Sequence, residues 1–280
     1  MSTKITISEL DLAYFHYIPN RPACYVGIAV FSILFILLNI RVLTSGYRWY
    51  VYLLPLTAAA EVVGFALRYI CSKNPTTDVF TAMSILLLIS ANIMALVNYK
   101  AVGDVIQLSG VETRYYVIGP DFARNFYKTN LVASILQAVG GGLQAPSGSR
   151  STGSTLTIVG ITIQLVFFAI FLVSVHYVNT CPDYRLHYNG QNHKRSVMRV
   201  MYITMALLFV RSLYRLANYV IVYNNLGEVH EWTFYVFDAL LIAVCFLIHC
   251  IWFIGHYIPR GTLDIEGKGP DAIYITRNNV

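Results

Sequence analysis

Seven long apolar stretches alternate along the chain with short polar segments. A helix of about 20 residues crosses the ~30 Å hydrocarbon layer of a bilayer, and each stretch is long enough to do so. The fourth stretch is the least apolar, because it opens with Lys128 and carries Gly140, Gly141 and Gly142. The pattern predicts an all-α, polytopic membrane protein with seven transmembrane helices, at residues 23–43, 50–71, 79–101, 128–146, 154–178, 198–222 and 232–256.

Turn-forming residues lie between these stretches and support the predicted breaks. Asn74-Pro75 follows the second stretch, and residues 146–153, rich in Ser and Gly, follow the fourth. Proline and glycine punctuate helices because proline lacks a backbone donor and glycine favours turns. The prediction divides the chain into an N-terminal segment, a seven-helix transmembrane domain and a tail, at residues 1–22, 23–256 and 257–280.

Positive charge is distributed unevenly between the two sides of this arrangement. An odd number of helices places the termini on opposite sides. The side that carries the C-terminal tail holds 13 of the 20 Lys and Arg, and the other side holds four. Basic loops stay in the cytosol, so we expect an extracellular N-terminus and a cytosolic tail. This topology accounts for the net charge of +6, and no nucleic-acid partner is expected.

The composition excludes an ordinary soluble protein. Hydrophobic residues make up 56% of the chain and charged residues 12%, whereas soluble domains carry roughly 25% charge. The loops are too short for a soluble domain. The sequence has no G-x-x-x-x-G-K-[ST] loop, so nucleotide hydrolysis by that route is excluded. No cofactor, metal or catalytic residue is predicted.

Charged residues inside the predicted helices are the candidate functional groups. A charge near mid-bilayer costs roughly 2.5–3.5 kcal/mol or more, so such side chains should face the bundle interior and pair. Arg211 and Arg215 lie one helical turn apart, and Glu61 and Arg68 lie two turns apart, which places each pair on one face. From a rise of ~1.5 Å per residue we expect two tiers that open toward the outer leaflet. The deeper tier pairs Glu61 with Arg211, and the outer tier holds Arg68, Arg215 and Asp238.

Two roles fit these charges. They bind the head of an amphiphilic substrate, or they form a buried ion-pair clamp that only fixes helix register. Gln137 and Gln164 add polar groups, either as substrate contacts or as hydrogen bonds that join two helices. Because ionisable residues within a membrane mark functional sites by default, the predicted substrate-binding set consists of Glu61, Arg68, Arg211, Arg215, Glu231, Asp238, Gln137 and Gln164.

Histidines raise the alternative of a zinc-dependent membrane hydrolase. His249 and His256 lie seven residues apart on the last helix and would share a face. His176, His187 and His193 lie toward the same cytosolic side. The sequence has no His-Glu-x-x-His motif, so interfacial and loop positions explain these histidines more simply.

Several motifs, in order along the chain, resemble the fungal RTA-like proteins, the lipid-translocating exporter family. Residues 61–68 read E-V-V-G-F-A-L-R, similar to the family's E-x-x-G-[YF]-x-x-R, and residues 211–215 read R-S-L-Y-R. The resemblance covers more than half of the chain. The other matching segments are S-I-L-Q-A-V-G-G-G-L at 134–143, Gly160 with Gln164, and E-x-x-x-Y-x-F-D at 231–238.

Three positions depart from the family pattern. Asn130 and Asn218 stand where the family often has an acid, and Gly103-Asp104 stands where Gly-Arg is usual. The two missing acids indicate a subgroup with a different substrate.

The resemblance implies a fungal seven-span protein of the plasma membrane, linked to stress response and drug resistance. It would be an exporter or flippase for amphiphiles such as sphingoid long-chain bases, sterol-like toxicants and phospholipid, rather than an enzyme. The expected partners are membrane lipids or amphiphilic small molecules, and Glu61 is the candidate proton carrier. The main alternative is a seven-span lipid sensor that signals through its cytosolic loops. The oligomeric state is not predicted.

Overall fold

Long helices make up most of the computed structural model, which describes residues 15, 17, 19–45, 48–109, 121–143, 150–184, 186–188, 191–224, 230–257, 263–266 and 273–276. The helical elements are α2 (Arg21–Ser45), η1 (Trp49–Tyr52), α3 (Leu53–Cys71), α4 (Thr77–Leu108), α5 (Phe122–Leu143), α6 (Arg150–Thr180), α7 (Lys194–Asn224), α8 (Glu231–Phe234), η3 (Tyr235–Leu240), α9 (Leu241–Ile251) and η4 (Ile254–His256). Two short antiparallel hairpins pair β1 (His187–Tyr188) with β2 (Gln191–Asn192) and β3 (Leu263–Glu266) with β4 (Ile273–Thr276).

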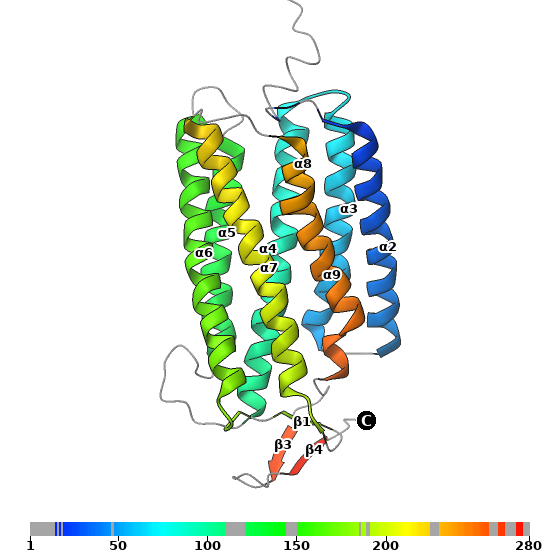
Figure 1. The fold of residues 1–280 in the computed structure, drawn as a ribbon, viewed down its shortest axis with the longest axis vertical. Coiled ribbons are helices and arrows are strands. Elements are labelled where there is room, and N and C mark those ends of the chain that lie inside the picture. The colour runs from blue at the N-terminus through cyan, green and yellow to red at the C-terminus, as the bar shows by residue number, and fades with distance from the viewer. Residues whose placement is uncertain are drawn as a thin grey trace, which may run out of the picture.

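The long helices stand side by side in one elongated bundle, and successive helices run in opposite directions (Figure 1). Each helix from α2 to α7 packs against the next one, and α9 closes the ring by packing on both α7 and α2. α4 also packs on α7, so it contributes to the bundle interior. The chain enters α2 at one end of the bundle, and the β3–β4 hairpin lies beyond the other end (Figure 1).

The outside of the bundle is apolar, which is the reverse of a soluble protein. Val26, Ile33 and Leu43 on α2 are exposed, whereas charged and amide side chains are buried between the helices. Six helical segments in the described part of the chain are long and apolar enough to cross a membrane. α5 is not one of the six, because Lys128 and Asn130 are among the polar residues that lower its hydropathy. The chain is therefore a helical integral membrane protein.

α4 continues past the point at which the sequence predicted its end. Gly103 and Asp104 lie inside the helix, which ends at Leu108. The Asp104 carboxylate accepts a hydrogen bond of 2.7 Å from the Tyr50 hydroxyl and one of 3.2 Å from Arg48. These two donors offset the cost of burying the carboxylate, so the helix extends without exposing it.

α5 begins at Phe122, six residues before its predicted start. Aromatic contacts explain the difference, because the rings of Phe122 and Phe126 lie 5.8 Å and 5.6 Å from that of Phe171 on α6. Buried aromatic pairs stabilise this first helical turn, although the hydropathy of its residues does not predict a helix there. The predicted end of this helix, at residue 146, lies outside the described residues.

The last membrane helix is not the single regular helix that the sequence predicted for 232–256. Its first turn, α8, leads into the π-helical segment η3, and α9 ends at Ile251. A π-helical segment has a wider turn than an α-helix and is frequent at functional sites. Asp238 lies in this segment.

The two predicted terminal segments are described only in part. Phe15, Tyr17, Pro19 and Asn20 are described in the N-terminal segment, and the rest of residues 1–20 lies outside the described residues. In the tail, the structure describes Tyr257 and the β3–β4 hairpin, which the sequence analysis did not predict.

Candidate functional site

A buried ion-pair triad joins α7 to η3. Arg211 and Arg215 lie one turn apart on α7, and both contact Asp238. Arg215 donates two hydrogen bonds to the carboxylate, of 2.7 Å and 3.0 Å, which is the bidentate geometry that guanidinium groups favour. Nε of Arg211 lies 2.8 Å from Oδ1, without the alignment of a hydrogen bond, and its Nη2 donates to Oδ2 at 3.4 Å. We call these three residues the triad.

The triad carries more positive than negative charge. Two guanidinium groups face one carboxylate, and Arg211 and Asp238 are each only 3% exposed. Nη2 of Arg211 also donates to the backbone oxygen of Leu87 at 2.9 Å, which ties the triad to α4. An excess charge inside a membrane protein is costly, so a nearby anion is expected to balance it.

Glu61 hydrogen-bonds a serine instead of pairing with the arginine that the sequence predicted. The carboxylate is 1% exposed and accepts a hydrogen bond from the Ser90 hydroxyl on α4. Within the described residues it forms no ion pair, although Arg211, Arg215 and Asp238 are close enough to act on it electrostatically. The predicted pairing of Glu61 with Arg211 is wrong, because Asp238 in η3 holds the guanidinium instead.

Arg68 is also placed differently from the prediction. Its guanidinium donates to the Tyr17 hydroxyl at 2.7 Å and lies 3.6 Å from the Glu231 carboxylate. The rings of Phe15, Tyr17, Phe234 and Tyr235 surround it, with the Phe234 centroid at 4.1 Å. Such rings stabilise a buried cation through their negative faces. The predicted outer tier of Arg68 with Arg215 and Asp238 is therefore split into two groups.

The N-terminal segment covers the Arg68 group. Both carboxylate oxygens of Glu231 accept a bond of 2.8 Å from the backbone N–H of Asn20, just before α2. Burial raises the pKa of Tyr17, an effect that its contact with Arg68 opposes. This arrangement could not be predicted, because nothing in the spacing of Phe15 and Tyr17 along the sequence shows that they fold back onto α3.

Four amide side chains form a second buried cluster, between α4, α5 and α6. Gln137 donates to Gln164 at 2.8 Å, and Gln164 donates in turn to Oδ1 of Asn92. Asn130 donates to the backbone oxygen of Asn92 at 3.2 Å. Gln137 and Gln164 were predicted as site residues, whereas Asn92 was not, and Asn130 stood out only as a position where the family often has an acid. We call these four residues the amide cluster.

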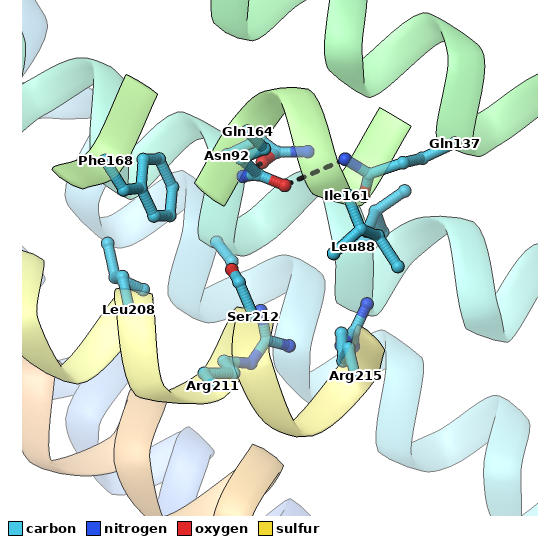
Figure 2. A pocket seen from close by; sticks show the side chains of 11 residues that line it. Leu88, Asn92, Gln137, Ile161, Gln164, Phe168, Leu208, Arg211, Ser212 and Arg215 are labelled. Atoms are coloured by element: carbon cyan, nitrogen blue, oxygen red, sulfur yellow. Dashed lines mark hydrogen bonds between the residues drawn. The ribbon is translucent and has the colours of Figure 1, made fainter. Parts of the chain in front are cut away.

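A crevice between α4, α5, α6 and α7 joins the triad to the amide cluster. Its enclosed space is about 10 Å³, and the volume rises to about 280 Å³ when the space open to the outside is included. Arg211, Ser212 and Arg215 lie on its α7 side, and Asn92, Gln137 and Gln164 lie across from them (Figure 2). The other lining residues are Leu88, Ala91, Ile161, Phe168 and Leu208.

Only half of the predicted substrate-binding set lines this crevice. Arg211, Arg215, Gln137 and Gln164 do so, and Asp238 lies behind the arginines. Glu61, Arg68 and Glu231 are not among the lining residues.

The histidines do not form a metal-binding group in the described part of the chain, where no three His, Cys, Asp or Glu side chains are placed to hold one ion. His249 is fully buried, and neither of its ring nitrogens has a hydrogen-bond partner.

Comparison with known proteins identifies sequences that are similar to this chain. The family model described as "RTA1 like protein" matches residues 54–261, which include the triad, the amide cluster and the crevice. Two relatives from Saccharomyces cerevisiae, Protein RTM1 and Protoporphyrin uptake protein 1, are 32% and 29% identical over 67% of this chain. The chain spans 63% and 64% of the lengths of these two relatives.

A longer alignment joins this chain to the Sphingoid long-chain base transporter RSB1 of S. cerevisiae strain YJM789. The two are 26% identical over 81% of this chain and 69% of that protein. No solved structure matches this chain.

Proposed function

Because this chain belongs to the RTA1-like family of fungal membrane proteins, we propose that it is an exporter or flippase that moves amphiphilic molecules. Two relatives are named for the uptake or transport of such molecules, porphyrin in one case and sphingoid bases in the other. The observation that carries the proposal is the crevice, a polar cavity inside a bundle whose outside is apolar. Transporter sites of this kind lie between helices near the midplane.

The proposed substrates are sphingoid long-chain bases, sterol-like toxicants and phospholipid. In this proposal Arg211, Arg215, Gln137 and Gln164 contact the polar head within the crevice. Asp238 holds the two arginines in place, as the ion-pair distances support.

The three remaining residues of the predicted set, Glu61, Arg68 and Glu231, act outside the crevice. Glu61 carries a proton during transport; it is buried, accepts a hydrogen bond from the Ser90 hydroxyl and forms no ion pair within the described residues. Arg68 and Glu231 bind the substrate at the end of the bundle where the N-terminal segment lies.

We further propose that α5 is a seventh membrane span, with the N-terminus outside and the tail in the cytosol of a plasma-membrane protein. The packing of α5 between α4 and α6 supports this count. Protease-cleavable tags on the two termini test it in intact cells. The N-terminal tag should be cleaved and the C-terminal tag protected, whereas equal cleavage of both would contradict an odd number of spans.

The tolerance of cells to toxic amphiphiles tests the function. Expression of this chain in yeast should raise tolerance to at least one of a cationic, a neutral and an anionic amphiphile. Arg215→Gln should abolish the gain at an unchanged surface amount, because the remaining Arg211 and Asp238 still form a one-to-one ion pair. Arg199→Gln, at an exposed position of the same helix, should retain the gain.

Two outcomes would contradict this account. Full tolerance with Arg215→Gln would exclude the crevice as the transport site. No gain with the unaltered chain, despite surface protein, would exclude the exporter and favour the sensor.

A further inference from the structure

We infer that the crevice between α4, α5, α6 and α7 binds an anionic headgroup, a phosphate or a carboxylate. This inference rests on the proposed function and names the class of substrate that the crevice recognises. It differs from the cationic class expected for a sphingoid base.

The charge of the crevice wall is the first argument. Two arginines line the crevice, and no acidic residue is among its lining residues in the described chain. Asp238 lies behind them and supplies one negative charge for two positive charges. The second acid nearby, Glu61, hydrogen-bonds Ser90 instead of either arginine and carries a proton in the proposed function. Arg215 uses Nε and Nη2 for Asp238, which leaves Nη1 for a ligand. A cationic head would meet this excess positive charge at close range and be repelled, whereas an anionic oxygen would balance it.

Unpartnered amide atoms are the second, independent argument. Nδ2 of Asn92 and Oε1 of Gln137 have no hydrogen-bond partner, and their residues are only 6% and 2% exposed. Both residues line the crevice (Figure 2). A buried unpaired donor or acceptor costs about 1–3 kcal/mol, so a partner is expected when the site is occupied.

The two amide atoms also indicate which groups the ligand carries. Nδ2 of Asn92 would donate to an anionic oxygen, the same group that Arg215 attracts. Oε1 of Gln137 is an acceptor and would take a hydrogen bond from a protonated oxygen, such as the hydroxyl beside a phosphate ester or the acid form of a phosphate or carboxylate. A headgroup with both kinds of oxygen satisfies all three residues together.

The size of the crevice limits what enters it. The enclosed space of the crevice is about 10 Å³, which holds about one water-sized group, so it admits the tip of a headgroup, such as a single anionic oxygen, and not an acyl chain. The apolar side chains of Leu88 and Ile161 line the same crevice and would contact the first carbons of the tail.

Equilibrium binding to the purified chain in phosphatidylcholine nanodiscs tests the inference. The probes are radiolabelled dodecyl phosphate, dodecanoate and dodecylamine, with binding to empty nanodiscs subtracted and inorganic phosphate as a competitor. We expect the two anionic probes to bind at least about tenfold more tightly than the amine. Competition by inorganic phosphate at millimolar concentration would assign the site to free phosphate as well as to a lipid headgroup, and its failure to compete would assign the site to the amphiphile.

Matched variants complete the test. Arg215→Gln and Asn92→Leu should each weaken dodecyl phosphate binding by about tenfold, and Arg199→Gln should leave it unchanged. Equal binding of the amine, or unchanged phosphate binding in Arg215→Gln, would overturn the inference. Transport of a cationic amphiphile without anion binding would refute the inference and leave the proposed function standing. Anion binding without any transport would refute the proposed function and leave the inference standing.

Discussion

Asp238→Asn should destabilise the folded protein by about 3–5 kcal/mol, which is the usual cost of removing one partner from a buried ion pair. The variant leaves Arg211 and Arg215 facing each other inside the bundle without the carboxylate that lies between them. Their repulsion and their lost hydrogen bonds act together. We expect a clear fall in the unfolding temperature of the detergent-solubilised protein and less protein at the cell surface.

A compensating variant separates charge balance from general damage. Asp238→Asn combined with Arg215→Gln removes one charge of each sign and should recover a large part of the lost stability. Asp78→Asn, at an exposed position in the first turn of α4, is the matched control and should cost only a few tenths of a kcal/mol. If Asp238→Asn unfolds at the same temperature as the unaltered chain, the triad does not stabilise the bundle.

Gly140→Ala should force α5 and α6 apart. A Cβ atom at Gly140 would lie 2.6 Å from the backbone oxygen of Gly153 and 2.7 Å from the backbone nitrogen of Thr157, and it would also overlap the Thr157 hydroxyl. Backbone atoms cannot rotate away, so the helices must separate, at a cost of roughly 1–3 kcal/mol. Gln137 lies one turn from this contact, and we expect its hydrogen bond to Gln164 to break and transport to fall with it.

The neighbouring glycines provide the control. A Cβ at Gly141 or Gly142 meets nothing within 4 Å, so Gly141→Ala and Gly142→Ala should be neutral or stabilise the helix by up to about 1 kcal/mol. Thermal unfolding of the three variants checks the contrast. Equal effects at the three positions would show that the close approach of α5 and α6 is not specific to Gly140.

The sequence was informative where a single helix decides the outcome. Apolar length located the long helices, and helical spacing placed Arg211 and Arg215 on one face of α7. Gln137 and Gln164 stood out as polar residues within two apolar helices, with hydrogen bonding between helices as one of their two predicted roles, and a hydrogen bond joins the two side chains. Each of these properties depends on local periodicity, which a sequence displays directly.

Partners across helices were harder to predict. Tyr235 and Asp238 lie three residues apart, a spacing that places two residues on one face of a regular α-helix, but the π-helical segment changes the turn between them. Tyr235 therefore contacts Cys24 on α2, whereas Asp238 contacts α7. The partners of Arg68 were also hidden, since Tyr17 reaches it from the N-terminal segment. Such contacts depend on how elements that are distant in sequence pack together, and the hydropathy pattern does not show this packing.

Leaflet exchange in liposomes tests the central claim most directly. The purified chain is reconstituted with a labelled single-chain phosphate amphiphile or a labelled sphingoid base, and Arg215→Gln is compared at matched incorporation. We predict that the unaltered chain exchanges at least one of the labelled amphiphiles faster than protein-free liposomes and that Arg215→Gln does not. No exchange of either amphiphile, with the folded state of the protein verified, would contradict the claim that this chain moves amphiphiles through its crevice.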